Sequence, residues 1–152
     1  MSVLRGRLLR PVFCTNPQIY SMICDVANRP FTILSTLCNR AIASFEEVKS
    51  VKNDQKTLLI DVREPQELQE TGVIPGSINI PLGEVETVLK RTSSEDFLKR
   101  YGKEKPGRSA SIIFSCKSGK RSADAQDVAA KLGFDNTKNY LGGWLDWEER
   151  NK

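Results

Sequence analysis

Two short apolar runs restrict the fold of this chain more than any other pattern in it. Residues 57–62 (Thr-Leu-Leu-Ile-Asp-Val) and 111–115 (Ser-Ile-Ile-Phe-Ser) are almost continuously apolar. Such runs are typical of strands that a sheet buries on both faces, as in parallel sheets covered by helices. Helical patterns alternate with these runs along the chain. The sequence therefore predicts an α/β fold with a parallel sheet.

Capping signals and apolar periodicity predict the remaining elements. Ser44 and Glu47 form a capping box that opens a helix over residues 45–51. A helix over residues 118–132, ended by Gly133, is predicted by apolar residues at helical spacing, namely Ala125, Val128, Ala129 and Leu132. Further helices are expected over residues 65–70, 83–90, 93–101 and 144–150, strands over residues 77–80 and 137–141, and a surface loop over residues 103–108.

Residues 1–43 differ in composition from the rest of the chain. Their bases are all arginine, they contain no lysine and no glutamate, and serine and threonine recur. This composition is typical of a mitochondrial transit peptide. We therefore expect residues 1–43 to be a transit peptide or a disordered leader, cleaved between about residues 28 and 42, and residues 44–152 to form the domain. The expected location is the mitochondrial matrix, with the cytosol as the alternative.

The positive charge of the chain lies in its first third. The net charge is +4, and residues 1–45 already supply it, because they carry Asp25 and five arginines, namely Arg5, Arg7, Arg10, Arg29 and Arg40. Residues 46–152 are therefore neutral overall and give no sign of a basic face for nucleic acid. No stretch of the chain approaches the apolar length that spans a bilayer. We expect neither a nucleic-acid partner nor a membrane partner.

The chain contains no histidine. That absence excludes Ser-His-Asp and Cys-His catalytic sites, HExxH metal sites and histidine zinc sites. We expect no metal and no cofactor. A nucleophile in this chain has to be activated by other means.

Cys116 is the candidate nucleophile. The other three cysteines, Cys14, Cys24 and Cys38, lie in the expected leader, so the processed domain retains Cys116 alone. An intramolecular disulfide is then impossible, which suits a reducing compartment. Cys116 also lies between an apolar strand and a helix, and the N–H groups at the start of that helix stabilise an anion.

The residues after Cys116 favour a thiolate. Gly119 lets the backbone curl so that successive N–H groups point inward and form a nest for an anion. Positive charge is added within five residues by Lys117, Lys120 and Arg121. We expect these effects to lower the pKa of the Cys116 thiol. The alternative is a buried structural cysteine at the end of a strand, which apolar neighbours would suit better than this basic loop.

Four segments, in this order, make residues 44–147 resemble a single-domain rhodanese, a thiosulfate sulfurtransferase-like protein. They are Asp-Val-Arg-Glu at 61–64, Gly-Val-Ile-Pro-Gly-Ser-Ile-Asn-Ile-Pro at 72–81, Cys-Lys-Ser-Gly-Lys-Arg at 116–121, and Asn-Tyr-Leu-Gly-Gly-Trp-Leu-Asp-Trp at 139–147, with Leu-Gly-Phe at 132–134 before the last. The resemblance implies a three-layer fold, in which helices cover both faces of a central five-stranded parallel sheet.

The resemblance also implies a sulfurtransferase reaction. Cys116 would take the outer sulfur of thiosulfate or a related donor as a persulfide, and would pass it to cyanide or to a thiol such as glutathione or thioredoxin. The donor would be bound by the loop, that is by Lys117, Ser118, Gly119, Lys120 and Arg121. We expect the protein to act as a monomer.

Asp61 and Arg63 match the Asp-Val-Arg signature of the family. One interpretation places them at the mouth of the pocket, as support for it. The other, which we favour, is structural: the aspartate anchors N–H groups of a loop and the arginine pairs with a carboxylate.

Two other functions compete with sulfur transfer. Cysteine-dependent phosphatases related to rhodaneses carry a Cys-x5-Arg loop, whereas this chain has Cys116-x4-Arg121, and its loop offers no general acid for a leaving group. The loop length therefore favours the sulfurtransferase. The second alternative is a non-catalytic rhodanese module that regulates or binds proteins. Such modules often lose the cysteine or its basic neighbours, and this chain keeps them.

Overall fold

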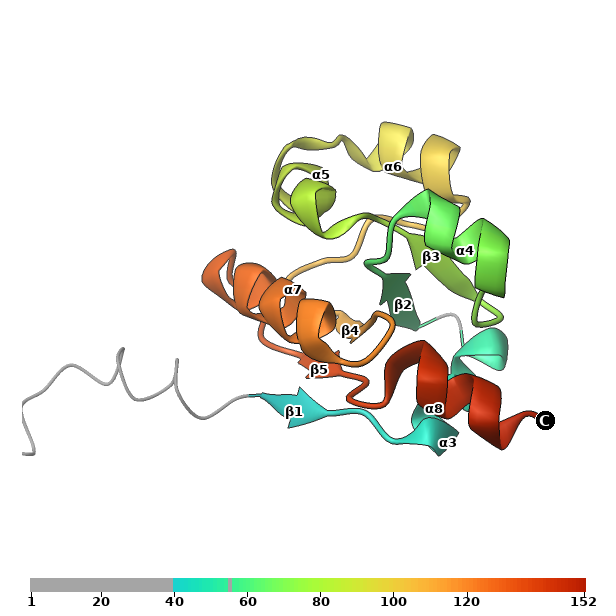
Figure 1. Cartoon of the computed structure of the whole chain (residues 1–152). Coiled ribbons are helices and arrows are strands. Elements are labelled where there is room, and N and C mark those ends of the chain that lie inside the picture. Colours follow the sequence, from blue (N-terminus) through green and yellow to red (C-terminus); the bar gives the residue numbers. More distant parts are fainter. Residues whose placement is uncertain (1–39, 55) are drawn as a thin grey trace, which may run out of the picture. The chain divides into compact units, whose positions relative to one another are not determined.

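A computed structural model of the protein describes residues 40–54 and 56–152. Along the chain the elements are β1 (Ala41–Ile42), α3 (Phe45–Ser50), the 3-10 helix η2 (Val51–Asn53), β2 (Thr57–Asp61), α4 (Pro65–Thr71), β3 (Ser77–Asn79), the 3-10 helix η3 (Leu82–Glu84), α5 (Val85–Arg91), α6 (Ser94–Tyr101), β4 (Ser111–Ser115), α7 (Lys120–Lys131), β5 (Thr137–Asn139) and α8 (Gly143–Arg150). Strands and helices therefore alternate over most of the described chain (Figure 1).

The five strands form one parallel sheet in the order β1-β5-β4-β2-β3. The two predicted apolar runs are its central strands, and Asp61 at the end of β2 lies opposite Ser115 at the end of β4. The loops that follow β2 and β4 therefore start side by side at the carboxyl edge, where open parallel sheets bind their ligands. The predicted five-stranded parallel sheet is confirmed.

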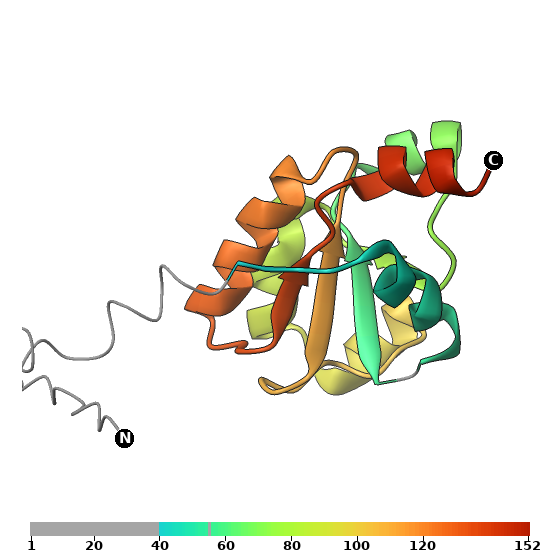
Figure 2. The same cartoon turned by 90° about the horizontal axis from the view of Figure 1, so that it is seen from below.

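Alternate residues of the central strands enter two separate cores. Leu58 and Ile60 of β2 pack with residues of α5, α6 and α7, whereas Leu59 packs with residues of α3 and α8. Successive side chains of a strand point to opposite faces of a sheet, so both faces of this sheet are covered. Figure 2 shows the layers, with α7 on one side of the strands and α3 on the other. The three-layer arrangement follows from this alternation.

The structure differs from the predicted elements mainly at their ends. The helix expected over residues 118–132 begins only at Lys120, because Gly119 precedes it with a left-handed φ of +83°. The strand expected to end at Leu141 ends at Asn139. The segment expected as a helix over residues 83–90 consists of η3 followed by α5.

The edge strand β1 was not predicted. It has two residues, and it pairs Ala41 and Ile42 with Lys138 and Asn139 of β5. Two residues carry no periodicity, and Ile42 is mostly exposed. The sheet thus begins inside the range that we assigned to the leader. Residues 1–39 of that range, with Cys14, Cys24 and Cys38, lie outside the described residues. None of the helices within residues 40–54 and 56–152 is long and apolar enough to cross a bilayer.

Candidate active site

Cys116 lies directly after β4 at the carboxyl edge of the sheet. Its loop continues through Ser118 and Gly119 into α7, two residues further than the helix start expected from the sequence. The neighbouring strand is tied to the same point, since the N–H of Val62 donates to the carbonyl of Ser115 over 2.8 Å. The strand end, the loop and the helix start therefore form one rigid unit around the thiol.

The sulfur of Cys116 accepts two hydrogen bonds. The N–H of Gly119 lies 3.1 Å from Sγ, and the hydroxyl of Ser122 lies 3.4 Å from it. Both donors come from the same loop and the first turn of α7, so they point back at the strand end. Gly119, which we expected to let the backbone curl, has a left-handed φ and is itself one of the donors. Ser122 was not among the predicted residues.

These two hydrogen bonds, together with two further backbone N–H groups, lower the pKa of the Cys116 thiol. Burial acts in the opposite direction and would by itself raise it. The hydroxyl of Ser122 and the backbone N–H groups of Ser122, Ser118 and Gly119 together outweigh burial, because each of them stabilises the thiolate. The pKa of this thiol is therefore lowered without any histidine.

The segment after β5 forms backbone hydrogen bonds with the Cys116 loop. The N–H of Trp144 donates to the carbonyl of Cys116 over 2.8 Å, and the N–H of Leu145 donates to that of Lys117 over 3.2 Å. Gly143 has a φ of +58°, and a Cβ atom there would lie 2.4 Å from the Cys116 carbonyl oxygen. Only glycine allows the two backbones to approach so closely. The second of the two glycines at 142–143 is thus required by the site.

Gly119 also lies close to the segment after β5, at the backbone of Leu141. A Cβ atom at this position would lie 2.0 Å from the carbonyl oxygen of Leu141. The carbonyl of Gly119 in turn accepts from the side-chain amide of Asn139 over 3.1 Å. The shape of the Cys116 loop is therefore determined by backbone contacts with residues 139–145 as well as by its own sequence.

The three cations of the loop differ in their surroundings. Lys117 and Lys120 are exposed, and neither forms an ion pair with any residue in the described part of the chain. Arg121 is half-buried and forms a bidentate pair with Glu67 of α4, through hydrogen bonds of 2.6 and 2.8 Å. Its charge is therefore already compensated. Glu67 lies 54 residues away in sequence, so no local pattern pointed to it.

Asp61 and Arg63 form a fully buried ion pair below the loop. The guanidinium of Arg63 donates to both carboxylate oxygens of Asp61, with distances of 2.7 to 3.0 Å. It also donates to the carbonyl of Gly72 and the hydroxyl of Thr71, and it lies 4.9 Å from the centre of the Trp144 ring. Arg63 thus connects the end of α4 to the residue that supports the Cys116 carbonyl, and has no hydrogen bond to the sulfur.

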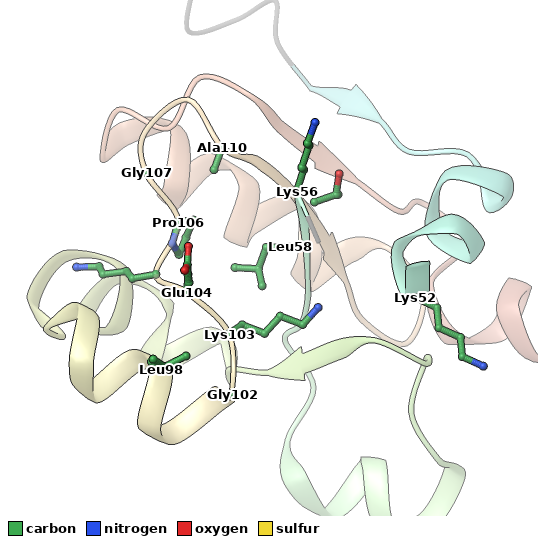
Figure 3. A pocket seen from close by; sticks show the side chains of 12 residues that line it. Lys52, Lys56, Leu58, Leu98, Gly102, Lys103, Glu104, Pro106, Gly107 and Ala110 are labelled. Atoms are coloured by element: carbon green, nitrogen blue, oxygen red, sulfur yellow. The ribbon is translucent and has the colours of Figure 1, made fainter. Parts of the chain in front are cut away.

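A cavity of about 780 Å³ lies away from this site, at the amino ends of β2 and β4. Figure 3 shows Leu58 of β2 facing a loop that carries Lys103 and Pro106. None of the predicted site residues lines this cavity. The chemistry expected of Cys116 therefore belongs to the loop at the carboxyl edge and not to this cavity.

The rhodanese-like domain matches residues 44–150 of this chain. A thiosulfate:glutathione sulfurtransferase of Saccharomyces cerevisiae is 41% identical over 106 residues, which are 68% of this chain and 75% of that protein. A mitochondrial thiosulfate sulfurtransferase of the same yeast, RDL2, is 34% identical over 126 residues, or 80% and 83% of the two chains. The chain therefore belongs to the rhodanese-like family.

The fold agrees with that assignment. The structure of the human single-domain sulfurtransferase TSTD1 is similar to this chain with a TM-score of 0.65 at 33% identity, covering 73% of this chain and 97% of that one. The similarity spans nearly the whole of the human protein, so the described domain corresponds to a complete single-domain relative. Relatives of this chain are named as sulfurtransferases.

Proposed function

We propose that this protein is a thiosulfate sulfurtransferase that carries sulfur on Cys116 as a persulfide. The observation that carries the proposal is the pair of hydrogen bonds to Sγ from Gly119 and Ser122, with the lowered pKa that accompanies them. A thiolate is the reactive form of cysteine. The names of two relatives, a thiosulfate:glutathione sulfurtransferase and a thiosulfate sulfurtransferase, support the same reaction.

The reaction consists of two displacements at sulfur. The Cys116 thiolate attacks the outer sulfur of thiosulfate, a new S–S bond forms, and the bond to the sulfonate sulfur breaks so that sulfite leaves with the electron pair. An acceptor thiolate then attacks the outer sulfur of the Cys116 persulfide. The acceptor becomes a persulfide and the Cys116 thiolate is restored, so no external oxidant or reductant is consumed. Cyanide in place of the thiol yields thiocyanate.

The loop residues have distinct roles in this proposal. The N–H groups of Ser118, Gly119 and Ser122 stabilise negative charge on sulfur before and after transfer, because the persulfide is also an anion. Lys117 and Lys120 attract the anionic donor, since both are exposed and unpaired within the described residues. Arg121 contributes mainly through its contact with Glu67. Asp61 and Arg63 hold the surrounding backbone in position.

The rival function is a non-catalytic module, in which Cys116 would be a structural thiol. Burial alone does not separate the two, because Cys116 is only 1% exposed and structural cysteines are buried as well. The hydrogen bonds to Sγ support the enzyme, since a structural thiol needs no donors aimed at its sulfur. This is the specific observation that favours the enzyme.

Intact-mass measurement tests the proposal directly. The protein is incubated with thiosulfate, and we expect a gain of one sulfur atom that disappears when cyanide or glutathione is added. Cys116→Ser should show neither the gain nor any transfer to cyanide. Sulfur transfer at the normal rate by the serine variant would refute the assignment. Two results in the native protein would favour the non-catalytic module. The mass would be the same with and without thiosulfate, and the pH profile of Cys116 alkylation would match that of a free cysteine.

The acceptor and the location form the second part of the proposal. Cys116 is the free cysteine of the described residues, so a resolving thiol has to come from outside the domain, and glutathione or thioredoxin would supply it. We propose action as a monomer in the mitochondrial matrix. The composition of residues 1–43 and the mitochondrial relative support that location. Kinetic comparison of cyanide, glutathione and thioredoxin as acceptors, and imaging of the full chain in cells, test the two parts separately.

A further inference from the structure

The pair between Glu67 and Arg121 changes the charge beside the Cys116 loop. The loop contains three cations, but the fork of Arg121 donates to both oxygens of the Glu67 carboxylate, at 2.6 and 2.8 Å. Such bidentate pairs are strong and fix both partners. The two charges compensate each other, and the uncompensated cations of the loop are then Lys117 and Lys120.

Glu67 is held in place independently of Arg121. Its carboxylate accepts from the N–H of Glu64 in the capping box at the start of α4. Its own carbonyl accepts from the Thr71 hydroxyl, to which Arg63 also donates. The carboxylate is therefore aimed at Arg121 by the helix. A glutamate is ionised at neutral pH in any case, and the hydrogen bonds from Arg121 lower the pKa of Glu67 further, to about 2.

Arg121 is close enough to Cys116 for their charges to interact. The pKa of Arg121 is raised first by its hydrogen bonds to Glu67 and, to a smaller extent, by the negative charge of the Cys116 thiolate. An unpaired Arg121 would therefore add to the attraction for any anion that approaches the sulfur. Glu67 compensates that attraction, because it pairs with Arg121 in the same loop that carries the sulfur.

We propose that Glu67 is a specificity-determining residue that restrains the binding of doubly charged sulfur donors. This inference rests on the proposed sulfur transfer and specifies the class of donor. Thiosulfate carries two negative charges, whereas persulfides and thiosulfonates carry one at the reacting end. Pairing Arg121 with Glu67 lowers the advantage of the dianion more than that of a monoanion, because the attraction grows with the charge of the donor. Singly charged donors therefore compete better with thiosulfate for the site.

Two donors that deliver the same outer sulfur test this role. Methanethiosulfonate has a methyl group in place of one charged oxygen of thiosulfate, and it releases methanesulfinate where thiosulfate releases sulfite. The readout is the ratio of kcat/KM for thiosulfate to that for methanethiosulfonate. In Glu67→Gln we expect this ratio to rise about fivefold, mainly through KM for thiosulfate, since one more cation then faces the extra charge. The increase should shrink at high salt.

The control variants separate charge from structure. Glu70→Gln removes an exposed carboxylate from the same helix and should leave the ratio unchanged. Arg121→Gln leaves Glu67 uncompensated and should lower the ratio, and the double variant Glu67→Gln/Arg121→Gln should bring it back near the native value. An unchanged ratio in a folded Glu67→Gln variant, or equal losses with both donors, would overturn the specificity role. Absence of sulfur transfer from either donor in the native protein would instead overturn the proposed function itself.

Discussion

The hydroxyl of Ser122 donates a hydrogen bond to the sulfur of Cys116 over 3.4 Å, from a position six residues further along the chain. Both residues are buried. The contact exists because α7 starts immediately after the loop and turns its first residues back toward β4. One side chain of α7 therefore contributes directly to the state of the thiol.

Replacement of Ser122 by alanine should make Cys116 less reactive at neutral pH. The variant loses a donor that stabilises the thiolate, so the pKa of the thiol should rise, and the alkylation profile with iodoacetamide should move to higher pH. The rate at pH 7 should fall about fivefold, as expected for one hydrogen bond of about 1 kcal/mol. Ser115→Ala is the matched control, since the buried Ser115 hydroxyl has no hydrogen-bond partner among the described residues. Equal profiles for both variants would contradict the role of Ser122.

Replacement of Gly119 by alanine should disrupt the loop. The new Cβ atom would meet the Leu141 carbonyl at 2.0 Å, and the φ of +83° is unfavourable for alanine. We expect a loss of about 2 kcal/mol or more in the free energy of unfolding, measured in urea, together with loss of sulfur transfer. Gly83→Ala has no atom within 4 Å of the added carbon and should change stability by less than about 0.5 kcal/mol. Full activity of Gly119→Ala would show that the loop tolerates another shape.

Removal of Arg63 should destabilise the fold without changing the thiol. Arg63→Met leaves the buried Asp61 carboxylate unpaired, which costs about 3–5 kcal/mol. The double variant Asp61→Asn/Arg63→Met should recover part of this loss, because no buried charge remains. In the folded double variant the pH profile of Cys116 alkylation should match that of the native protein. A shifted profile would show that the ion pair acts on the chemistry and not only on the backbone.

Neutralisation of either exposed lysine should weaken donor binding. Lys117→Gln and Lys120→Gln should each raise KM for thiosulfate about threefold, because a charge is removed near the path of the dianion, while kcat changes little. The effect should decrease as ionic strength rises. Lys131→Gln, an exposed lysine at the far end of α7, provides the comparison and should behave like the native protein. A salt-independent effect would exclude electrostatic attraction as its cause.

The pair between Glu67 and Arg121 should stabilise the protein only above acidic pH. Glu67 has its pKa lowered from 4.5 to about 2 by the hydrogen bonds from Arg121. A lowered pKa in the folded state means that the stabilisation is present above pH 4.5 and is lost as the pH falls toward 2. The stability difference between the native protein and Glu67→Gln should therefore be constant from pH 6 to 8 and vanish near pH 2. A difference that is largest at pH 2 would contradict this linkage.

Much of the site follows from local sequence. The strand 111–115, Cys116 and Gly119 predict a thiol held by backbone N–H groups at a helix start, and the structure agrees. Local patterns suffice here because the donors to the sulfur lie within six residues of it, in a loop whose course depends on one glycine. The same reasoning gave no sign that Arg121 pairs with Glu67, and the predicted role of Arg121 in donor binding stays a prediction.

What the sequence determined by itself is the type of most elements and the candidate nucleophile, because periodicity, caps and the Cys116 loop are encoded over short distances. Only the tertiary structure decided which distant groups complete the site. Glu67 compensates Arg121, Trp144 supports the Cys116 carbonyl, and β1 closes the edge of the sheet. Such contacts depend on how the sheet and helices pack. They join residues that are far apart in the sequence, and no local motif connects such residues.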